Sequence, residues 1–155
     1  MDLQAVRATV SEIARAAGAV LMEKFEQPHE ERVKKNVTDI VTEADLASEA
    51  AVIPRLTAAF PDHRIVSEEG GGAGLGKSAE EAEYFWYIDP LDGTSNYASN
   101  IPFFSVSIAL SDKHMNPLVG VVFDPFSDEL YSAAKGYGAS LNGRPINASG
   151  QQSLS

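Results

Sequence analysis

Two aspartates that stand three positions apart, Asp89 and Asp92, have the clearest potential for chemistry in this sequence. The aromatic and β-branched run at 84–88 precedes them and predicts a buried strand that ends at Ile88. A strand end is a rigid frame, and two carboxylates with a main-chain carbonyl supply the oxygen ligands that Mg²⁺ prefers. The segment 89–94 (DPLDGT) therefore predicts a divalent-cation site.

The last two residues of this segment fit the same chemistry. Gly93 allows close approach of the backbone, and Thr94 places a hydroxyl beside backbone N–H donors that suit a phosphate group. The competing interpretation is a plain turn, because Asp-Pro and Asp-Gly are common turn dipeptides. For Asp92-Gly93 alone the turn is favoured, but it does not account for the complete hexapeptide.

Two helices are expected before this segment. Apolar residues at spacings of three and four predict a first helix from Asp2 to about Phe25. Thr42 is suited to cap a second helix that stops at Pro61. Pro54 lies inside the second pattern and lacks a backbone donor, so a kink or an earlier break is expected there.

The rest of the chain has the pattern of short strands. The glycine-rich segment 70–76 is typical of a loop, and Asn142-Gly143 is typical of a hairpin turn. Two helices followed by a mostly antiparallel meander predict an α+β domain over residues 1–146, with 147–155 as a linker or frayed end. The expected strands are 65–66, 84–88, 104–110, 118–123, 129–134 and 144–146.

Composition limits the classes of function. The chain has 155 residues and no cysteine, so it can form no disulfide. Its formal net charge of −10 argues against sequence-independent binding of nucleic acid. No apolar run resembles a signal peptide or a membrane span, so we expect a cytoplasmic protein with no membrane or nucleic-acid partner. His29, His63 and His114 lie in polar or turn contexts without ligand spacing, and we expect all three on the surface.

Several motifs together resemble the inositol monophosphatase family, in the fructose-1,6-bisphosphatase-like sugar phosphatase superfamily. They follow the family order along nearly the whole chain: DIVTEAD at 39–45, SEEG at 67–70, WYIDPLDGTSNY at 86–97, GYGA at 136–139 and LNGRPI at 141–146. The resemblance implies two N-terminal helices packed on a largely antiparallel sheet. This is the N-terminal part of a layered αβαβα fold.

The resemblance also implies a site for two or three Mg²⁺ ions. Glu68, Asp89 and the Leu91 carbonyl would hold the first ion, and Asp89 would bridge to a second ion that Asp92 also binds. Leu91 and Asp92 would also lie against the phosphate of a small phosphorylated substrate.

Further roles follow from the same resemblance. Thr94 and the first glutamate of the pair would orient the attacking water, Asp45 would hold Thr94, and the amides of Gly93 and Thr94 would grip the phosphate. Glu69 is expected to support a ligand rather than bind metal itself, and Lys34 aligns with a family lysine near the active site.

The implied activity is Mg²⁺-dependent hydrolysis of a small phosphorylated polyol by direct in-line attack of water. The default substrate is inositol monophosphate, which would give inositol and phosphate. Fructose 1,6-bisphosphate, 3′-phosphoadenosine 5′-phosphate and histidinol phosphate are alternatives among enzymes with the same first signature. A full-length member is expected to form a homodimer.

The sequence departs from the family in one respect. Family members have a second half, whose Trp-Asp motif completes the second metal site and which holds most substrate contacts. The only tryptophan here is Trp86, which is followed by Tyr87, so we expect the C-terminal half of the family fold to be absent from these residues. Two hypotheses follow: a fragment of a working phosphatase, or a non-catalytic module that binds metal or phosphate. A Trp-Asp motif in the reading frame after Ser155 would favour the first.

Overall fold

The computed structural model describes residues 1–25, 37–67 and 74–151, which form three helices and eight strands. The elements are α1 (Leu3–Phe25), α3 (Val37–Ala59), β1 (Arg64–Ser67), β2 (Leu75–Gly76), β3 (Tyr84–Asp92), α4 (Thr94–Ala98), β4 (Ser105–Asp112), β5 (Pro117–Asp124), β6 (Glu129–Ala134), β7 (Gly138–Leu141) and β8 (Arg144–Ile146). Among the described helices, none is both long and apolar enough to cross a bilayer.

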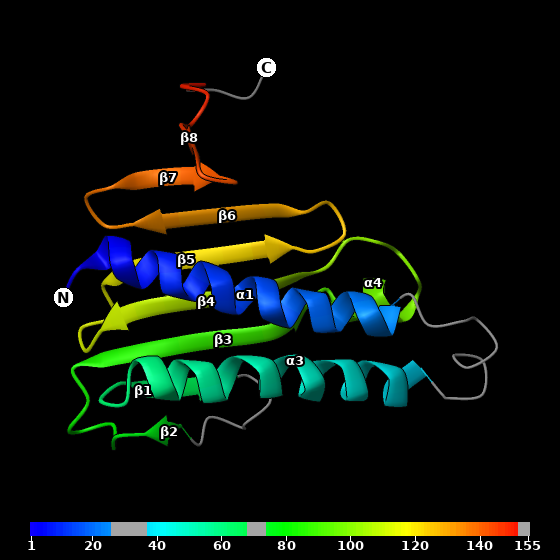
Figure 1. Ribbon diagram of the computed structural model, residues 1–155, viewed down its shortest axis with the longest axis horizontal. Coiled ribbons are helices and arrows are strands. Elements are labelled where there is room, and N and C mark those ends of the chain that lie inside the picture. Colours follow the sequence, from blue (N-terminus) through cyan, green and yellow to red (C-terminus); the bar gives the residue numbers. More distant parts are fainter. Residues whose placement is uncertain (26–36, 68–73, 152–155) are drawn as a thin grey trace.

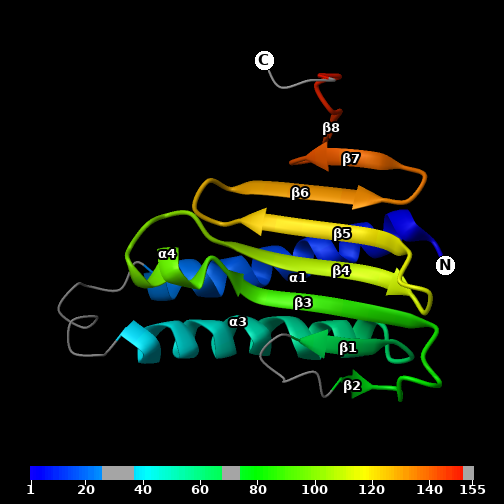
Figure 2. The ribbon, with the colours of Figure 1, turned by 180° about the vertical axis from the view of Figure 1, so that it is seen from behind.

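All eight strands form one sheet in the order β2-β1-β3-β4-β5-β6-β7-β8. The β1–β3 pair is parallel, and the other pairs of this sheet are antiparallel. Helices α1 and α3 lie side by side across one face, as Figures 1 and 2 show from opposite sides. The predicted α+β class, with two helices packed on a mostly antiparallel sheet, is therefore confirmed.

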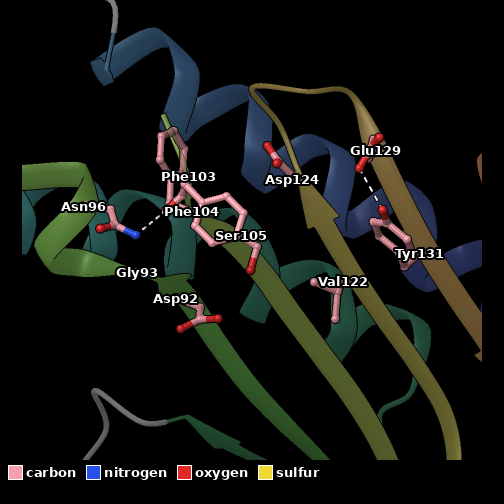
Figure 3. Close-up of a pocket in the computed structure, with 10 residues that line it drawn as sticks. All are labelled: Asp92, Gly93, Asn96, Phe103, Phe104, Ser105, Val122, Asp124, Glu129 and Tyr131. Atoms are coloured by element: carbon pink, nitrogen blue, oxygen red, sulfur yellow. Dashed lines mark hydrogen bonds between the residues drawn. The ribbon is translucent and has the colours of Figure 1, made fainter. Parts of the chain in front are cut away.

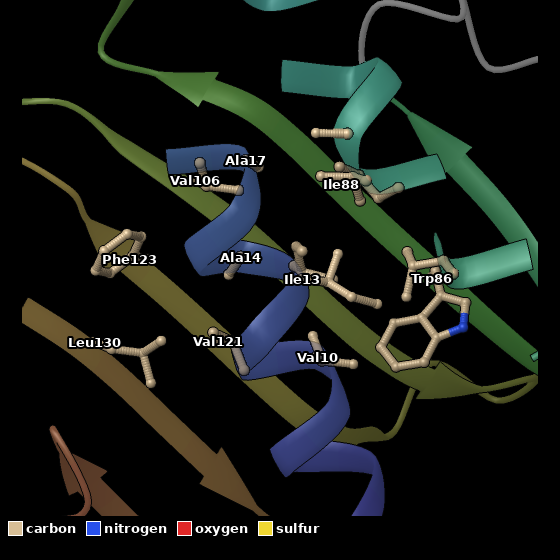
Figure 4. Close-up of a cluster of buried hydrophobic side chains, with 14 of the residues drawn as sticks. Val10, Ile13, Ala14, Ala17, Trp86, Ile88, Val106, Val121, Phe123 and Leu130 are labelled. Carbon is tan, nitrogen blue, oxygen red and sulfur yellow. The ribbon is translucent and has the colours of Figure 1, made fainter. Parts of the chain in front are cut away.

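The core lies between the helices and this face of the sheet (Figure 4). The predicted apolar stripe of α1 is buried, and β4 alternates as expected because successive side chains of a strand point to opposite faces. The residues of these predicted patterns that are buried are Val6, Val10, Ile13, Ala17 and Leu21 of α1 and Val106, Ile108 and Leu110 of β4.

Helix α3 differs from its prediction at its first residue, and it does not break at Pro54, where a kink or a break was expected. It begins at Val37 rather than after Thr42, and it continues to Ala59 without the predicted break at Pro54. Pro54 is exposed, so water can reach the carbonyl that loses its donor. The guanidinium of Arg55 also donates to the Ala51 carbonyl at 2.8 Å, which supports the backbone at this turn.

The three histidines do not share one environment. His114 is exposed as predicted, and His29 lies outside the described residues. The surface prediction for His63 is wrong, because its side chain is buried and its ring stacks on Phe60 and Trp86, with ring centroids 5.2 and 5.9 Å away. Burial lowers the pKa of His63, and the charge of Asp62 opposes this effect more weakly.

We therefore expect stability to depend on pH through His63. A histidine whose folded-state pKa lies below its unfolded value contributes stability fully above about pH 6.5, and this stability is lost as pH falls toward the folded-state pKa. His63→Phe keeps an aromatic ring in the stack and removes the titration. Urea unfolding between pH 5 and 7 is expected to show a weaker pH dependence in this variant. If the free energy of unfolding changes with pH equally in wild type and His63→Phe, the pKa of His63 does not change on folding.

Candidate metal and phosphate site

Strand β3 carries the first four residues of the hexapeptide, 89–92, within the sheet rather than after it. The strand continues beyond its predicted end at Ile88 to Asp92, and its register shifts between the pairs Asp89–Ser107 and Asp92–Ser105. The irregularity contains Pro90, whose missing N–H is tolerated at a bulge. A bulge bends a strand and redirects its side chains, and here it stands at 89–92 in place of the competing interpretation, a plain turn.

Asp89 faces a shallow hollow on the sheet face opposite the helices. The hollow has a volume of about 380 Å³, and its lining includes Asp89, Tyr87 and Ser107 together with Ser67 at the end of β1. The carboxylate is half-buried, and its Oδ1 accepts a hydrogen bond of 3.2 Å from the Leu91 amide. One predicted ligand is thus held against the backbone of another.

Asp92 lines a second cavity on the same face, with a volume of about 410 Å³ (Figure 3). The opposite wall comes from β5 and β6, where Val122 and Tyr131 are exposed while the alternate residues of these strands are buried. Asp92 itself is exposed. Both predicted aspartate ligands therefore open onto the face that α1 and α3 leave uncovered.

Gly93 connects β3 to α4 in a backbone conformation that favours glycine. Its φ is 87°, and Thr94 begins α4 immediately afterwards. A β-carbon at position 93 would lie 3.0 Å from the Phe103 carbonyl oxygen. That oxygen accepts a hydrogen bond of 2.8 Å from Asn96, which fixes it in place. Thr94 is exposed at the start of the helix, beside Asp92.

We expect Gly93→Ala to lower the free energy of unfolding by more than the conformational effect alone, which is about 1–2 kcal/mol for an L-residue in this region. Gly136→Ala is a matched control, since Gly136 has a φ of 84° and no atom within 4 Å of its β-carbon position. Urea unfolding of both variants measures the difference. Equal losses would show that the close contact at position 93 contributes nothing.

Helix α3, which contacts β3, carries two buried polar side chains. Asp45 is 4% exposed and Ser48 is fully buried, and α3 is in contact with both β3 and α4. The hydroxyl of Ser48 donates to the Pro90 carbonyl oxygen at 2.7 Å. The expected contact between Asp45 and Thr94 remains a prediction.

Three predicted residues, Lys34, Glu68 and Glu69, lie outside the described part of the chain. Within residues 1–25, 37–67 and 74–151, no three His, Cys, Asp or Glu side chains gather in a way that could hold a metal ion. The described donors at the bulge are two carboxylates and backbone oxygens, without sulfur or imidazole. Such a donor set fits a hard cation such as Mg²⁺ rather than a soft one.

Sequence reasoning missed the elements that support the hexapeptide. Helix α4 was not predicted, and its Tyr97 is fully buried and donates from its hydroxyl to the Leu21 carbonyl of α1 at 2.8 Å. Ser48 was also missed, although it lies three residues after Asp45, on the same face of a helix. Asp45 and Ser48 are a polar pair three residues apart on an otherwise apolar helix face, and this pattern could have indicated a buried polar contact.

The fold is similar to that of known phosphatases. The inositol monophosphatase from Anabaena (Nostoc) matches it with a TM-score of 0.81 and 43% identity, covering 97% of this chain and 52% of that chain. The fold is therefore that of the N-terminal part of an α+β phosphatase. The model of the inositol monophosphatase family matches residues 2–155, and the chain belongs to this family.

Two relatives show the extent of the similarity. The fructose-1,6-bisphosphatase/inositol-1-monophosphatase of Aquifex aeolicus is 42% identical over 142 residues, covering 91% of this chain and 52% of that protein. The Nus factor SuhB of Pseudomonas aeruginosa is 43% identical over 143 residues, covering 91% and 51%. The chain therefore spans about half the length of the curated relatives that it matches. Members of the family are metal-dependent phosphomonoesterases, generally with Mg²⁺.

Proposed function

We propose that this chain carries the metal- and phosphate-binding part of a Mg²⁺-dependent phosphomonoesterase. The observation that carries the proposal is the bulge of β3, where Asp89 and Asp92 both open onto the uncovered face of the sheet and the first turn of α4 follows at once. Backbone N–H groups in the first turn of a helix have no partners within the helix and suit an anionic group.

The proposed ligands of the first ion are Glu68, Asp89 and the Leu91 carbonyl, and Asp89 and Asp92 would share the second ion. When bound, Mg²⁺ supplies a lowered pKa for an attacking water and neutralises charge on the phosphate oxygens. The parallel register supports this set, because Ser67 pairs with Ile88 and the next residues in sequence are Glu68 and Asp89.

The other proposed roles belong to the residues around the α4 terminus. The amides of Gly93 and Thr94 would bind phosphate oxygens, while the Thr94 hydroxyl and Glu68 would hold the attacking water. Asp45 would orient that hydroxyl from the buried side of α3. Glu69 would support a metal ligand rather than bind metal itself, and Lys34 would lie near the active site.

The proposed substrate is a small phosphorylated polyol, with inositol monophosphate as the default. Similarity to the Aquifex aeolicus protein, whose name covers two activities, supports both inositol 1-phosphate and fructose 1,6-bisphosphate. We further propose a cytoplasmic, homodimeric protein in its full-length form.

Phosphate release tests the proposal directly. The isolated chain and a version extended by the second half of a relative would be assayed with inositol 1-phosphate, fructose 1,6-bisphosphate and 3′-phosphoadenosine 5′-phosphate, with and without Mg²⁺. Release by either protein that requires Mg²⁺ supports the proposal. Release by the extended protein alone would show that the second half is needed for turnover. The absence of release from both, with each of the three esters, would contradict it.

The Pseudomonas aeruginosa relative is named Nus factor SuhB, and this name supports a second candidate role for the chain, as a Nus factor. The two roles are compatible, because a role in hydrolysis at the β3 bulge does not exclude contacts elsewhere on the chain. The formal net charge of −10 argues against direct, sequence-independent contact with nucleic acid in either role.

A further inference from the structure

We propose that Ser48 and Glu49, two consecutive residues of α3, are positioning residues for the metal ligands. Each forms a hydrogen bond with a different strand at the candidate site: Ser48 donates to β3, and Glu49 accepts from β1. The inference rests on the proposed function, and it assigns a role to a helix that supplies no proposed metal ligand.

Ser48 acts on a single peptide plane. Its hydroxyl donates to the Pro90 carbonyl at 2.7 Å, and the amide at the other end of that peptide unit, Leu91 N–H, donates to Asp89 Oδ1 at 3.2 Å. Because a peptide unit is planar, holding its carbonyl also fixes the direction of its N–H. Ser48 therefore orients the Asp89 carboxylate through this peptide, and the same peptide precedes the proposed Leu91 carbonyl ligand.

The contact between Ser48 and the Pro90 carbonyl is shielded from water. Ser48 and Pro90 are both fully buried, so water does not replace the hydroxyl. The Pro90 carbonyl lies in the irregular stretch between two paired positions of β3 and β4, where the regular ladder is interrupted. A buried carbonyl without a donor destabilises its local conformation by about 1–3 kcal/mol, which favours rotation of the peptide plane in the absence of Ser48.

Glu49 acts on the neighbouring strand. Its half-buried carboxylate accepts a hydrogen bond from the hydroxyl of Ser67, the last residue of β1. Ser67 is itself buried and precedes Glu68 in the sequence. Consecutive residues of a helix project about 100° apart, which lets one turn of α3 contact two adjacent strands. Since β1 and β3 are parallel neighbours and Ser67 pairs with Ile88, the two contacts hold both strands close to the residues that precede the proposed ligands.

The test is the affinity of the chain for Mn²⁺, measured by electron paramagnetic resonance of the free ion. Mn²⁺ takes the same oxygen ligands as Mg²⁺. Removal of a group that orients a ligand weakens metal binding by about tenfold or more. We expect this loss for Ser48→Ala and, independently, for Glu49→Ala, so that failure of one variant to fold leaves the other as a test. Ser48→Thr and Glu49→Gln keep the hydroxyl and the acceptor, and are expected to restore most of the affinity.

Two matched controls separate positioning from general stability. Ser132→Ala removes a buried serine that is 3.1 Å from Ser140, on β6 and β7, and Glu43→Ala removes an α3 carboxylate that pairs with Lys24 at 3.0 Å. Both are expected to lower the melting temperature without changing Mn²⁺ affinity.

The outcomes also separate this inference from the proposed function. Wild-type Mn²⁺ binding with equal affinity in Ser48→Ala and Glu49→Ala would overturn the positioning role alone. Losses of the same size in the two controls would also overturn it. If the wild-type chain and its extended version bind no Mn²⁺, the proposed metal site fails and this inference fails with it.

Discussion

Asp89→Asn is expected to reduce Mg²⁺-dependent phosphate release by at least about a hundredfold in kcat/KM, equivalent to about 2.7 kcal/mol of transition-state stabilisation. Asp89 is the proposed bridge between two ions, so its replacement removes one negative charge from both proposed metal positions. The amide of asparagine has one oxygen in place of two and no charge. It can still accept the hydrogen bond from Leu91 N–H, which preserves the local backbone.

The control for Asp89→Asn is Asp112→Asn, at the opposite end of the same ladder. Asp112 pairs with Tyr84 at the start of β3, and its carboxylate accepts hydrogen bonds from the His114 and Asn116 amides. This variant is expected to retain phosphate release, with some loss of stability in its turn. If the wild-type protein releases phosphate and Asp89→Asn releases it at the same rate, the metal assignment is contradicted.

Six strands were predicted where the pattern is local, but β2, at the end of the segment expected to be a loop, and β7 were not predicted. Alternation in β4 follows from the period of a strand, and Asn142-Gly143 forms the predicted hairpin turn with φ values of 48° and 78°. Boundaries were predicted less well where tertiary contacts outweigh local preference. Helix α3 begins five residues before Thr42 and includes Pro54, and it packs against α1, β3 and α4.

The candidate site was predictable as a set of residues and not as an arrangement. The hexapeptide indicates metal chemistry through its residue types, but the bulge depends on how β3 pairs with β4. The hydroxyl of Ser48 reaches a carbonyl 42 positions away in the sequence, and Tyr97 reaches one 76 positions away. Such contacts have no local signature, since each residue resembles an ordinary helical residue in its own window. His63 was mispredicted for the same reason, because one of its stacking partners, Trp86 of β3, is distant in sequence.

The largest expected loss of stability comes from Trp86→Ala. Trp86 is fully buried in β3, and its ring centroid lies 5.1 Å from that of Phe60 and 5.9 Å from that of His63. Truncation of a buried tryptophan lowers the free energy of unfolding by about 3–5 kcal/mol through lost contacts and a residual cavity. Domains of this size are stable by about 5–15 kcal/mol, so this one change removes a large fraction of the total.

The effect is expected to come from packing rather than from a hydrogen bond. The indole Nε1 has no hydrogen-bond partner among the described residues, so Trp86→Phe is expected to retain most of the stability. Phe126→Ala, at an aromatic residue that is 51% exposed, is a control with an expected loss below about 1 kcal/mol. Trp86 is the only tryptophan of the chain, and unfolding is therefore followed by far-ultraviolet circular dichroism rather than by fluorescence. A loss in Trp86→Ala no larger than in Phe126→Ala would contradict the placement of Trp86 in the core. Because β3 carries both Trp86 and the aspartates, such a result would also weaken the basis for the site.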